Sequence, residues 1–296
     1  MNHFSFELSI VAVLPALILC GYIFYKDRIE REPVGLLLIL FLSGFAAYIP
    51  SFFIQKYSTS LIDLIFKSKI EITAEGAVNY ATPFTRILHL SLCAVLGYSL
   101  ISILIRWLVL FFITRKNKSF NYLFDGVVYS VFISLGFAVC ENLHFIMQND
   151  TDMIVEKLIT SVPCHLFIGV LMGYYYTMWH MRFTANAIEN DLLMAGVIEK
   201  DNIRSSAVWL MGSLFIPLAI NSLYILAGKI KYDASSFIFY LAVFLLFGFS
   251  FITVNGIALK DASYGRFLYR IIAKGHPSLS AEQIKEAIEA EEKEAE

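Results

Sequence analysis

The chain has 296 residues, of which 58% are hydrophobic and 16% are charged. That balance is typical of a protein with several membrane spans and excludes an ordinary soluble domain. The formal net charge of −2 provides no basic surface for a phosphate backbone, so nucleic-acid binding is not expected.

Seven stretches of the chain are apolar enough, and long enough at about 20 residues, to cross a bilayer. Within lipid, a helix satisfies its own backbone hydrogen bonds, whereas a lipid-exposed irregular segment does not. The sequence therefore predicts an all-α polytopic transmembrane helical bundle over residues 1–260, followed by a cytoplasmic acidic helical tail over residues 261–296. The predicted spans are residues 7–25, 34–54, 86–113, 126–147, 157–181, 207–228 and 236–259.

The basic residues of the connections indicate how the bundle is oriented. Lys and Arg gather in the first, third and fifth connections and in the tail, whereas the fourth carries only Lys157, beside Asp150 and Asp152. Connections rich in Lys and Arg stay in the cytoplasm. We therefore expect the N-terminus outside and the C-terminus inside. The first six residues carry no Lys or Arg, so the first span is expected to be a retained anchor.

Two connections and the tail carry local patterns of their own. Residues 55–85 are expected to form a long external loop, in which Leu61 to Phe66 lie on the membrane surface or cover the bundle. The internal loop 182–206 is expected to hold a short helix around residues 188–198. Ser280 and Gln283 have the spacing of a capping box, which predicts an acidic helix from Ser280 onward.

Several polar groups fall at one depth of the predicted bundle. Glu141 lies inside an apolar stretch, where a carboxylate costs several kcal/mol. At about 1.5 Å of rise per residue, Glu141 lies about 9 Å, His165 about 12 Å and Asn221 about 10 Å inside the outer ends of their spans. The spans of Glu141 and His165 run antiparallel with a short connection, so we expect these two side chains to be neighbours.

The residue types leave more than one chemistry open. A buried carboxylate beside an imidazole suits a general base that activates water. His144 shares a helix face with Glu141 at i, i+3 spacing, and with His165 or His89 this pair would make a zinc-like cluster. The same groups also suit hydrogen bonds between packed helices, or proton transport.

Other residues have simpler interpretations. His89 is expected to be a satisfied helix-end residue, and Arg106 is expected to extend toward the cytoplasm. Gly169 and Gly173 have the GxxxG spacing of close helix packing. The four cysteines form no CxxC pair and are expected to be packing residues; they are Cys20, Cys93, Cys140 and Cys164.

Four segments, in this order along the chain, resemble the PrsW-type intramembrane protease family, which is related to the CAAX prenyl protease superfamily. They are Tyr25 to Pro33, Asp125-Gly-Val-Val-Tyr129, Gly136 to Asn142, and His165 followed by Gly173-Tyr-Tyr. The resemblance implies a peptidase of the bacterial inner membrane that acts on membrane-anchored regulatory proteins. It also implies a mechanism in which a glutamate activates water. A metal-dependent mechanism has been proposed for the superfamily as well.

The chain departs from the family pattern where the resemblance places the main catalytic motif. The family's Glu-Glu-x-x-Lys motif falls on Ser102, Ile103 and Arg106, and no Asp or Glu lies between Arg86 and Phe124. The family's later His-x-x-x-Asp or Asn motif falls on Pro217 and Asn221. The resemblance therefore implies a site with degenerate motifs.

The leading prediction is a PrsW-like peptidase that acts on membrane-anchored proteins. Glu141 would be its base, His165 would orient water or a divalent metal such as zinc, and Asn221 would be a polar stabiliser. The metal set would be Glu141, His144 and His165. One alternative is a non-catalytic relative that binds transmembrane segments of partner proteins. Another is a proton-coupled transporter of small solutes, in which Glu141 and His165 relay protons.

Overall fold

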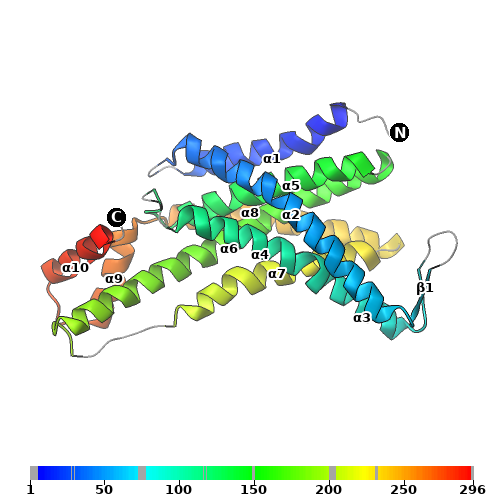
Figure 1. The fold of residues 1–296 in the computed structure, drawn as a ribbon. Coiled ribbons are helices and arrows are strands. Elements are labelled where there is room, and N and C mark those ends of the chain that lie inside the picture. The colour runs from blue at the N-terminus through cyan, green and yellow to red at the C-terminus, as the bar shows by residue number, and fades with distance from the viewer. Residues whose placement is uncertain are drawn as a thin grey trace.

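The computed structural model describes residues 6–27, 29, 31–72, 78–115, 117, 119–148, 151–199, 205–230 and 233–294. Within these ranges the chain is a helical bundle, and Figure 1 shows its long helices side by side. The elements are α1 (Phe6–Lys26), α2 (Val34–Phe66), β1 (Ile70–Ile72), β2 (Val78–Tyr80), α3 (Pro83–Leu92), η1 (Cys93–Ser99, a π-helix), α4 (Leu100–Thr114), α5 (Asp125–Gln148), α6 (Thr151–Met194), α7 (Ala207–Ile230), α8 (Asp233–Leu259), α9 (Tyr264–Gly275) and α10 (Ala281–Glu294).

The predicted all-α polytopic bundle is confirmed, with one small addition. In the described ranges, six helical segments are long and apolar enough to cross a membrane: α1, α2, α3 through α4, α5, α7 and α8. The seventh predicted span lies in α6, which is not among these six. α6 nevertheless packs along α5, α7 and α8. The addition is the antiparallel hairpin of β1 and β2, which pairs Ile70 with Tyr80.

Helix α5 lies at the centre of the bundle. Its membrane-spanning window is 89% buried, whereas no other candidate span exceeds 33%. It packs most extensively against α6 and α2, and also against α1 and α4. Because α5 carries Glu141, this carboxylate, which would be costly in lipid, belongs to the helix that lipid reaches least.

Small residues allow the helices around α5 to approach closely. A Cβ added at Gly136 would lie 2.1 Å from the carbonyl oxygen of Phe41 in α2. A Cβ added at Gly173 in α6 would lie 2.2 Å from the carbonyl oxygen of Gly126 in α5. The prediction of close packing at Gly173 is therefore confirmed, and glycines hold both neighbours of α5 at backbone contact.

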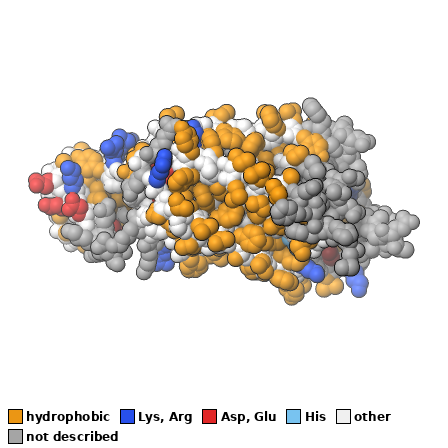
Figure 2. Space-filling model, turned by 90° about the horizontal axis from the view of Figure 1, so that it is seen from above, with side chains coloured by type: hydrophobic (Ala, Val, Ile, Leu, Met, Phe, Trp, Pro, Cys, Tyr) orange, Lys and Arg blue, Asp and Glu red, His pale blue; other side chains and the backbone are white. Residues whose placement is uncertain are grey.

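The outside of the bundle is apolar where lipid would surround it. Figure 2 shows hydrophobic side chains over the middle of the molecule and acidic and basic side chains at the end that carries α9 and α10. Exposed apolar residues occur along α1, α2 and α8, for example Ile18, Leu38 and Phe244. This distribution is the one expected of a bundle whose middle faces hydrocarbon and whose end faces water.

The first parts of two predicted loops are in fact helix. The chain after residue 54 continues as α2 to Phe66, so the expected surface segment 61–66 is the last part of a 33-residue helix. The short helix expected around residues 188–198 is the end of α6, which runs for 44 residues to Met194. In both places the chain remains helical because no Pro or Gly interrupts it.

The C-terminal helices pack on the far end of α6. Buried residues of α6, including Ile188, form a second apolar cluster with Leu268 of α9 and Ile284 of α10. The capping box before α10 is confirmed, because Gln283 N donates to Ser280 Oγ at 3.2 Å and Ser280 N donates to Gln283 Oε1 at 2.9 Å. The segment before α9 also contacts the bundle, since Asp261 accepts a hydrogen bond from Phe124 N at 3.0 Å.

Candidate functional site

Glu141 and His165 meet inside the bundle, as the sequence predicts. His165 Nε2 in α6 lies 3.1 Å from Glu141 Oε2 in α5. The Glu141 side chain is 24% exposed and that of His165 is 5% exposed, so the pair lies near the edge of the packed interior. The antiparallel arrangement of α5 and α6 brings the two side chains to one level.

Lys157 is a third member of this centre, and the prediction missed it. Its Nζ donates to Glu141 Oε1 at 2.5 Å, so both carboxylate oxygens of Glu141 have a donor. The Lys157 ammonium also lies 5.9 Å from the ring centroid of Tyr224 in α7. Lys157 precedes His165 by eight residues, about two helical turns, and this spacing on one face of α6 was the available signal.

Arg106 enters the centre from α4, contrary to the expectation that it would extend toward the cytoplasm. Its side chain is fully buried. Nη1 lies 3.0 Å from His165 Nδ1, and Nε donates to the carbonyl oxygen of Ser102 at 3.0 Å. The guanidinium carbon also lies 4.8 Å from the ring centroid of Phe137. Acceptors inside the bundle, together with an aromatic face, hold this cation in the interior.

The two partners of His165 define its protonation. A guanidinium group only donates hydrogen bonds, so His165 Nδ1 is the acceptor of the contact with Arg106. A neutral imidazole then carries its proton on Nε2, where it donates to Glu141. The centre thus contains two cations, Arg106 and Lys157, one carboxylate and a neutral imidazole.

Asn221 lies beside this centre rather than in it. Its Nδ2 donates to Ser99 Oγ at 3.2 Å and to Ser102 Oγ at 3.1 Å. Ser102 in turn accepts from Arg106 through its carbonyl oxygen. Among the described residues, the hydrogen bonds therefore lead from Asn221 to the Glu141 and His165 pair through Ser102 and Arg106.

His144 makes different contacts. Its Nδ1 lies 2.7 Å from the Tyr48 hydroxyl, and its Nε2 lies 2.9 Å from Gln148 Nε2. Its ring packs against Phe52. Among the described residues, a single group of His, Cys, Asp or Glu side chains brings three potential ligand atoms within 4.8 Å of one another, and it contains none of Glu141, His144 and His165.

The positions on which the resemblance places the family's Glu-Glu pair carry no acid. Ser102 is buried and donates through Oγ to the carbonyl oxygen of Ser99 at 3.1 Å. Ile103 is buried in the apolar core. Arg106, on which the resemblance places the family's lysine, lies one turn further along the same helix. Glu141 is therefore the carboxylate that the hydrogen bonds described here bring to this centre.

The bundle and its buried ionisable cluster define a polytopic membrane protein with a polar centre inside its helices. The sequence profile described as PrsW family intramembrane metalloprotease matches residues 32–251. The chain belongs to this family.

Bacterial proteins named Protease PrsW are similar to the chain. The one from Geobacillus kaustophilus is 30% identical over 171 residues, which are 58% of this chain and 66% of that relative. The one from Bacillus subtilis is 24% identical over 242 residues, 82% of this chain and 90% of the relative. The first relative is thus covered over slightly less than two thirds of its length. No solved structure matches the chain.

The residues of the centre do not fit the metal that the family description implies. A catalytic zinc takes three protein ligands and keeps a fourth position open. Glu141 and His165 offer two ligands, and Lys157 and Arg106 already bind both. A zinc-bound histidine normally donates its other ring N–H to a carboxylate, carbonyl or water, whereas His165 Nδ1 faces a guanidinium cation.

Proposed function

We propose that this PrsW-family protein binds transmembrane segments of membrane-anchored proteins and does not hydrolyse them. The observation that supports this most directly is the state of Glu141. A general base must take a proton from a water molecule, and a cation bound to its carboxylate weakens it as a base. Lys157 and His165 each donate to one oxygen of Glu141, and the resemblance places the family's acidic pair on Ser102 and Ile103, which carry no acid.

An apolar groove between α7 and α8 gives a partner segment a place to lie. The groove encloses about 740 Å³, and Leu223, Phe239 and Phe249 are among the residues that line it. Tyr224 also lines the groove, and its ring contacts the Lys157 ammonium. A single apolar helix is the occupant that suits this groove, because the groove faces the hydrocarbon layer and reaches the polar centre through Tyr224.

A second candidate function, hydrolysis, is supported by the exposure of the ion pair. The side chains of Glu141 and Lys157 are 24% and 22% exposed, so packed protein does not enclose them completely. In this alternative Glu141 is the base after Lys157 moves away, His165 orients the water, and Asn221 stabilises polar groups of the substrate.

One experiment separates the two candidates. The purified protein is reconstituted with a single-span test protein, and both cleavage and co-purification are measured. We expect co-purification without cleavage, and we expect Glu141→Gln to bind as the wild type does. If the wild type cleaves the test protein and Glu141→Gln does not, the peptidase hypothesis is correct and the non-catalytic proposal is wrong.

The groove has its own test. Leu223→Trp fills the groove, and it should reduce co-purification of the test protein at least several-fold. Leu38→Trp is the matched control, because Leu38 is an exposed apolar residue of α2 outside the groove. Equal binding by both variants would exclude the groove as the binding surface.

We also propose that the protein lies in the bacterial inner membrane with its N-terminus outside and α9 and α10 in the cytoplasm. The basic first, third and fifth connections support this orientation. Reporter domains fused after residue 296 and within the β1–β2 hairpin should give opposite signals. If both reporters are found on the same side of the membrane, the proposed topology is wrong.

A further inference from the structure

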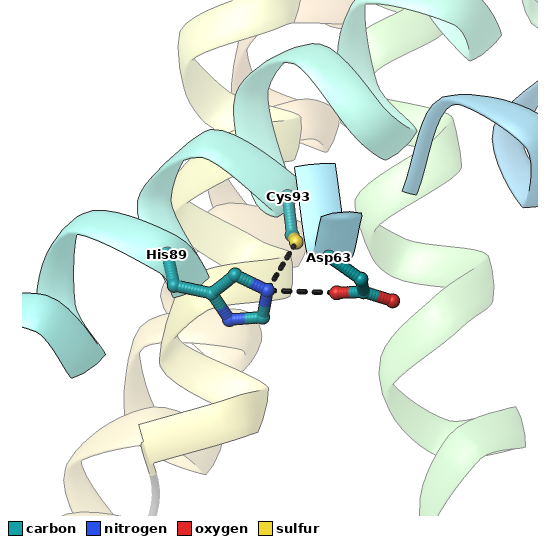
Figure 3. A group of neighbouring side chains, drawn as sticks. All are labelled: Asp63, His89 and Cys93. Atoms are coloured by element: carbon teal, nitrogen blue, oxygen red, sulfur yellow. Dashed lines mark hydrogen bonds and ion pairs between the residues drawn. The ribbon is translucent and has the colours of Figure 1, made fainter. Parts of the chain in front are cut away.

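A separate cluster of side chains lies at the end of the bundle away from α9 and α10, where α2 ends and α3 passes into η1 (Figures 1 and 3). It contains Asp63 of α2, His89 of α3 and Cys93, the first residue of η1. The potential ligand atoms of the three side chains all lie within 4.8 Å of one another. The family resemblance assigns none of these residues a role.

Two of the three side chains converge on one nitrogen of the third. Asp63 Oδ1 lies 2.8 Å and Cys93 Sγ 3.5 Å from His89 Nε2, as the dashed lines in Figure 3 show. These distances are close to those between neighbouring ligands of a four-coordinate zinc with bonds of about 2.0–2.3 Å. A small outward shift of the side chains would therefore place a cation between the three atoms.

The surroundings hold His89 in the orientation that a metal ligand requires. The Tyr80 hydroxyl of β2 lies 3.2 Å from His89 Nδ1, and the ring of Phe66 packs against the imidazole. An acceptor at the second ring nitrogen is the usual partner of a metal-bound histidine, because it fixes the ring and its tautomer. Here the hairpin supplies that partner, in contrast to the guanidinium that faces His165.

The backbone also brings the ligands together. His89 and Cys93 are four residues apart and so lie on one helix face. The helix changes to π geometry at Cys93, a local change that is common at functional sites. Asp63 reaches the pair from α2 and is 26 residues from His89 in the sequence. A bound ion would therefore join α2 to the α3–η1 segment.

The exposure of the three side chains suits a site that an ion can enter. Cys93 is buried and the His89 side chain is 10% exposed, whereas that of Asp63 is 63% exposed. An ion can therefore arrive from the Asp63 side, and a water molecule can take a fourth position there.

We propose that Asp63, His89 and Cys93 bind a zinc ion at this end of the bundle, independently of the Glu141 centre. A thiolate, an imidazole and a carboxylate together suit zinc, because alkaline-earth ions prefer oxygen ligands alone. On binding, the Cys93 thiol proton leaves to solvent. The imidazole of His89 carries its proton on Nδ1, which donates a hydrogen bond to the Tyr80 hydroxyl oxygen, and Nε2 binds the ion.

The first test uses the reduced, chelator-treated full chain in detergent and titrates it with Co²⁺ and then Zn²⁺. Co²⁺ should produce a thiolate-to-cobalt charge-transfer absorption, and Zn²⁺ should abolish it at one equivalent per chain and raise the melting temperature. Cys93→Ser should lose this absorption, and Cys20→Ser, which changes another buried cysteine, should keep it. Equal absorption in both variants, or none in the wild type, would overturn the proposal.

Two further variants keep the test decisive if Cys93→Ser does not fold. Asp63→Asn changes an exposed side chain and should lower zinc affinity at least tenfold. Tyr80→Phe removes the hydroxyl that accepts the hydrogen bond from His89 Nδ1, and this change should lower zinc affinity by about 10-fold. Zinc affinity in Asp63→Asn equal to that of the wild type would exclude this site, whatever the state of the cysteine variant.

Discussion

At the scale of single residues, the centre depends on the contact between Lys157 and Glu141. The two charges lie 2.5 Å apart in a partly exposed position. Removing one partner leaves the other charge without compensation, and that loss is larger than the net contribution of the pair. The contact therefore links the stability of the bundle to the same carboxylate that the family resemblance marks as functional.

A double-mutant cycle measures this contact. Lys157→Met and Glu141→Gln should each lower the free energy of unfolding, and the double variant should lose less than the sum of the two, with a coupling of about 1–3 kcal/mol. Lys229→Met serves as a control, since the Lys229 ammonium lies over the Tyr98 ring and not beside a carboxylate of this centre. Additive losses in thermal unfolding would show that the ion pair does not couple the two helices.

Asp261 gives a pH-dependent prediction at the same scale. Burial, opposed by backbone N–H donors that include Phe124, raises the pKa of Asp261 from 3.8 to about 6, and the nearby Asp27 adds to the increase. The folded chain therefore binds more protons than the unfolded chain between about pH 4 and about pH 6, and stability falls as the pH rises through this window.

Asp261→Asn removes this titration and keeps a side-chain oxygen for the N–H of Phe124. The melting temperature of the wild type should therefore fall relative to that of Asp261→Asn as the pH rises from about 4 to about 6. The measurement is a pair of melting curves at each pH in the same detergent. A constant difference between the two proteins would mean that Asp261 does not titrate in this range.

The sequence predicts part of this centre and misses part of it. Glu141 and His165 could be paired because depth and antiparallel direction follow from counting residues along two spans. Arg106 could not be placed, because the acceptors that hold it, Ser102 O and His165 Nδ1, come from its own turn and from another helix. Lys157 lies at the edge of its predicted span, where a lysine usually reaches water, so its contact with Glu141 depends on the packing of α5 against α6.

At the scale of elements, the helices follow from the sequence but their ends do not. The hydropathy pattern locates the spans because burial in lipid requires apolar side chains. It stops at the first polar residues, as at Gln55 and Arg182, although the backbone continues as helix there. α6 ends shortly before Gly196, whose positive φ of 69° breaks the helical geometry.

The contact between α2 and α5 gives a prediction for a single methyl group. Gly136→Ala would place its Cβ 2.1 Å from the carbonyl oxygen of Phe41, so the two helices must separate, at a cost of about 1–3 kcal/mol. Gly248→Ala in α8 is the control, because an added Cβ there meets nothing within 4 Å. Thermal unfolding should distinguish the two variants, and equal stability would contradict the close approach.

At the scale of the whole molecule, the two largest apolar clusters of the described residues are joined by α6. The larger core contains α5 and the helices around it, and the smaller one contains the end of α6 with α9 and α10. The sequence predicts a boundary at residue 260 between the spans and the tail. The tail is nevertheless docked, because its apolar residues pack on α6.

Ile284 tests whether the smaller core is a stable unit. It is 1% exposed, and Ile284→Ala should cost about 2–4 kcal/mol locally. We expect faster cleavage of α10 in limited proteolysis, with the transmembrane core still protected. Glu282→Ala changes an exposed residue of the same helix and should leave the cleavage rate unchanged. Equal protection of both variants would mean that α10 is not held by this contact.

The length of α6 has a mechanical consequence. Its 44 residues extend about 66 Å, roughly twice the thickness of the hydrocarbon layer. The first part of this helix carries Lys157 and His165, and its last part carries the surface on which α9 and α10 pack. Displacement of α9 or α10 would therefore act on the same helix whose first part carries the charges that surround Glu141.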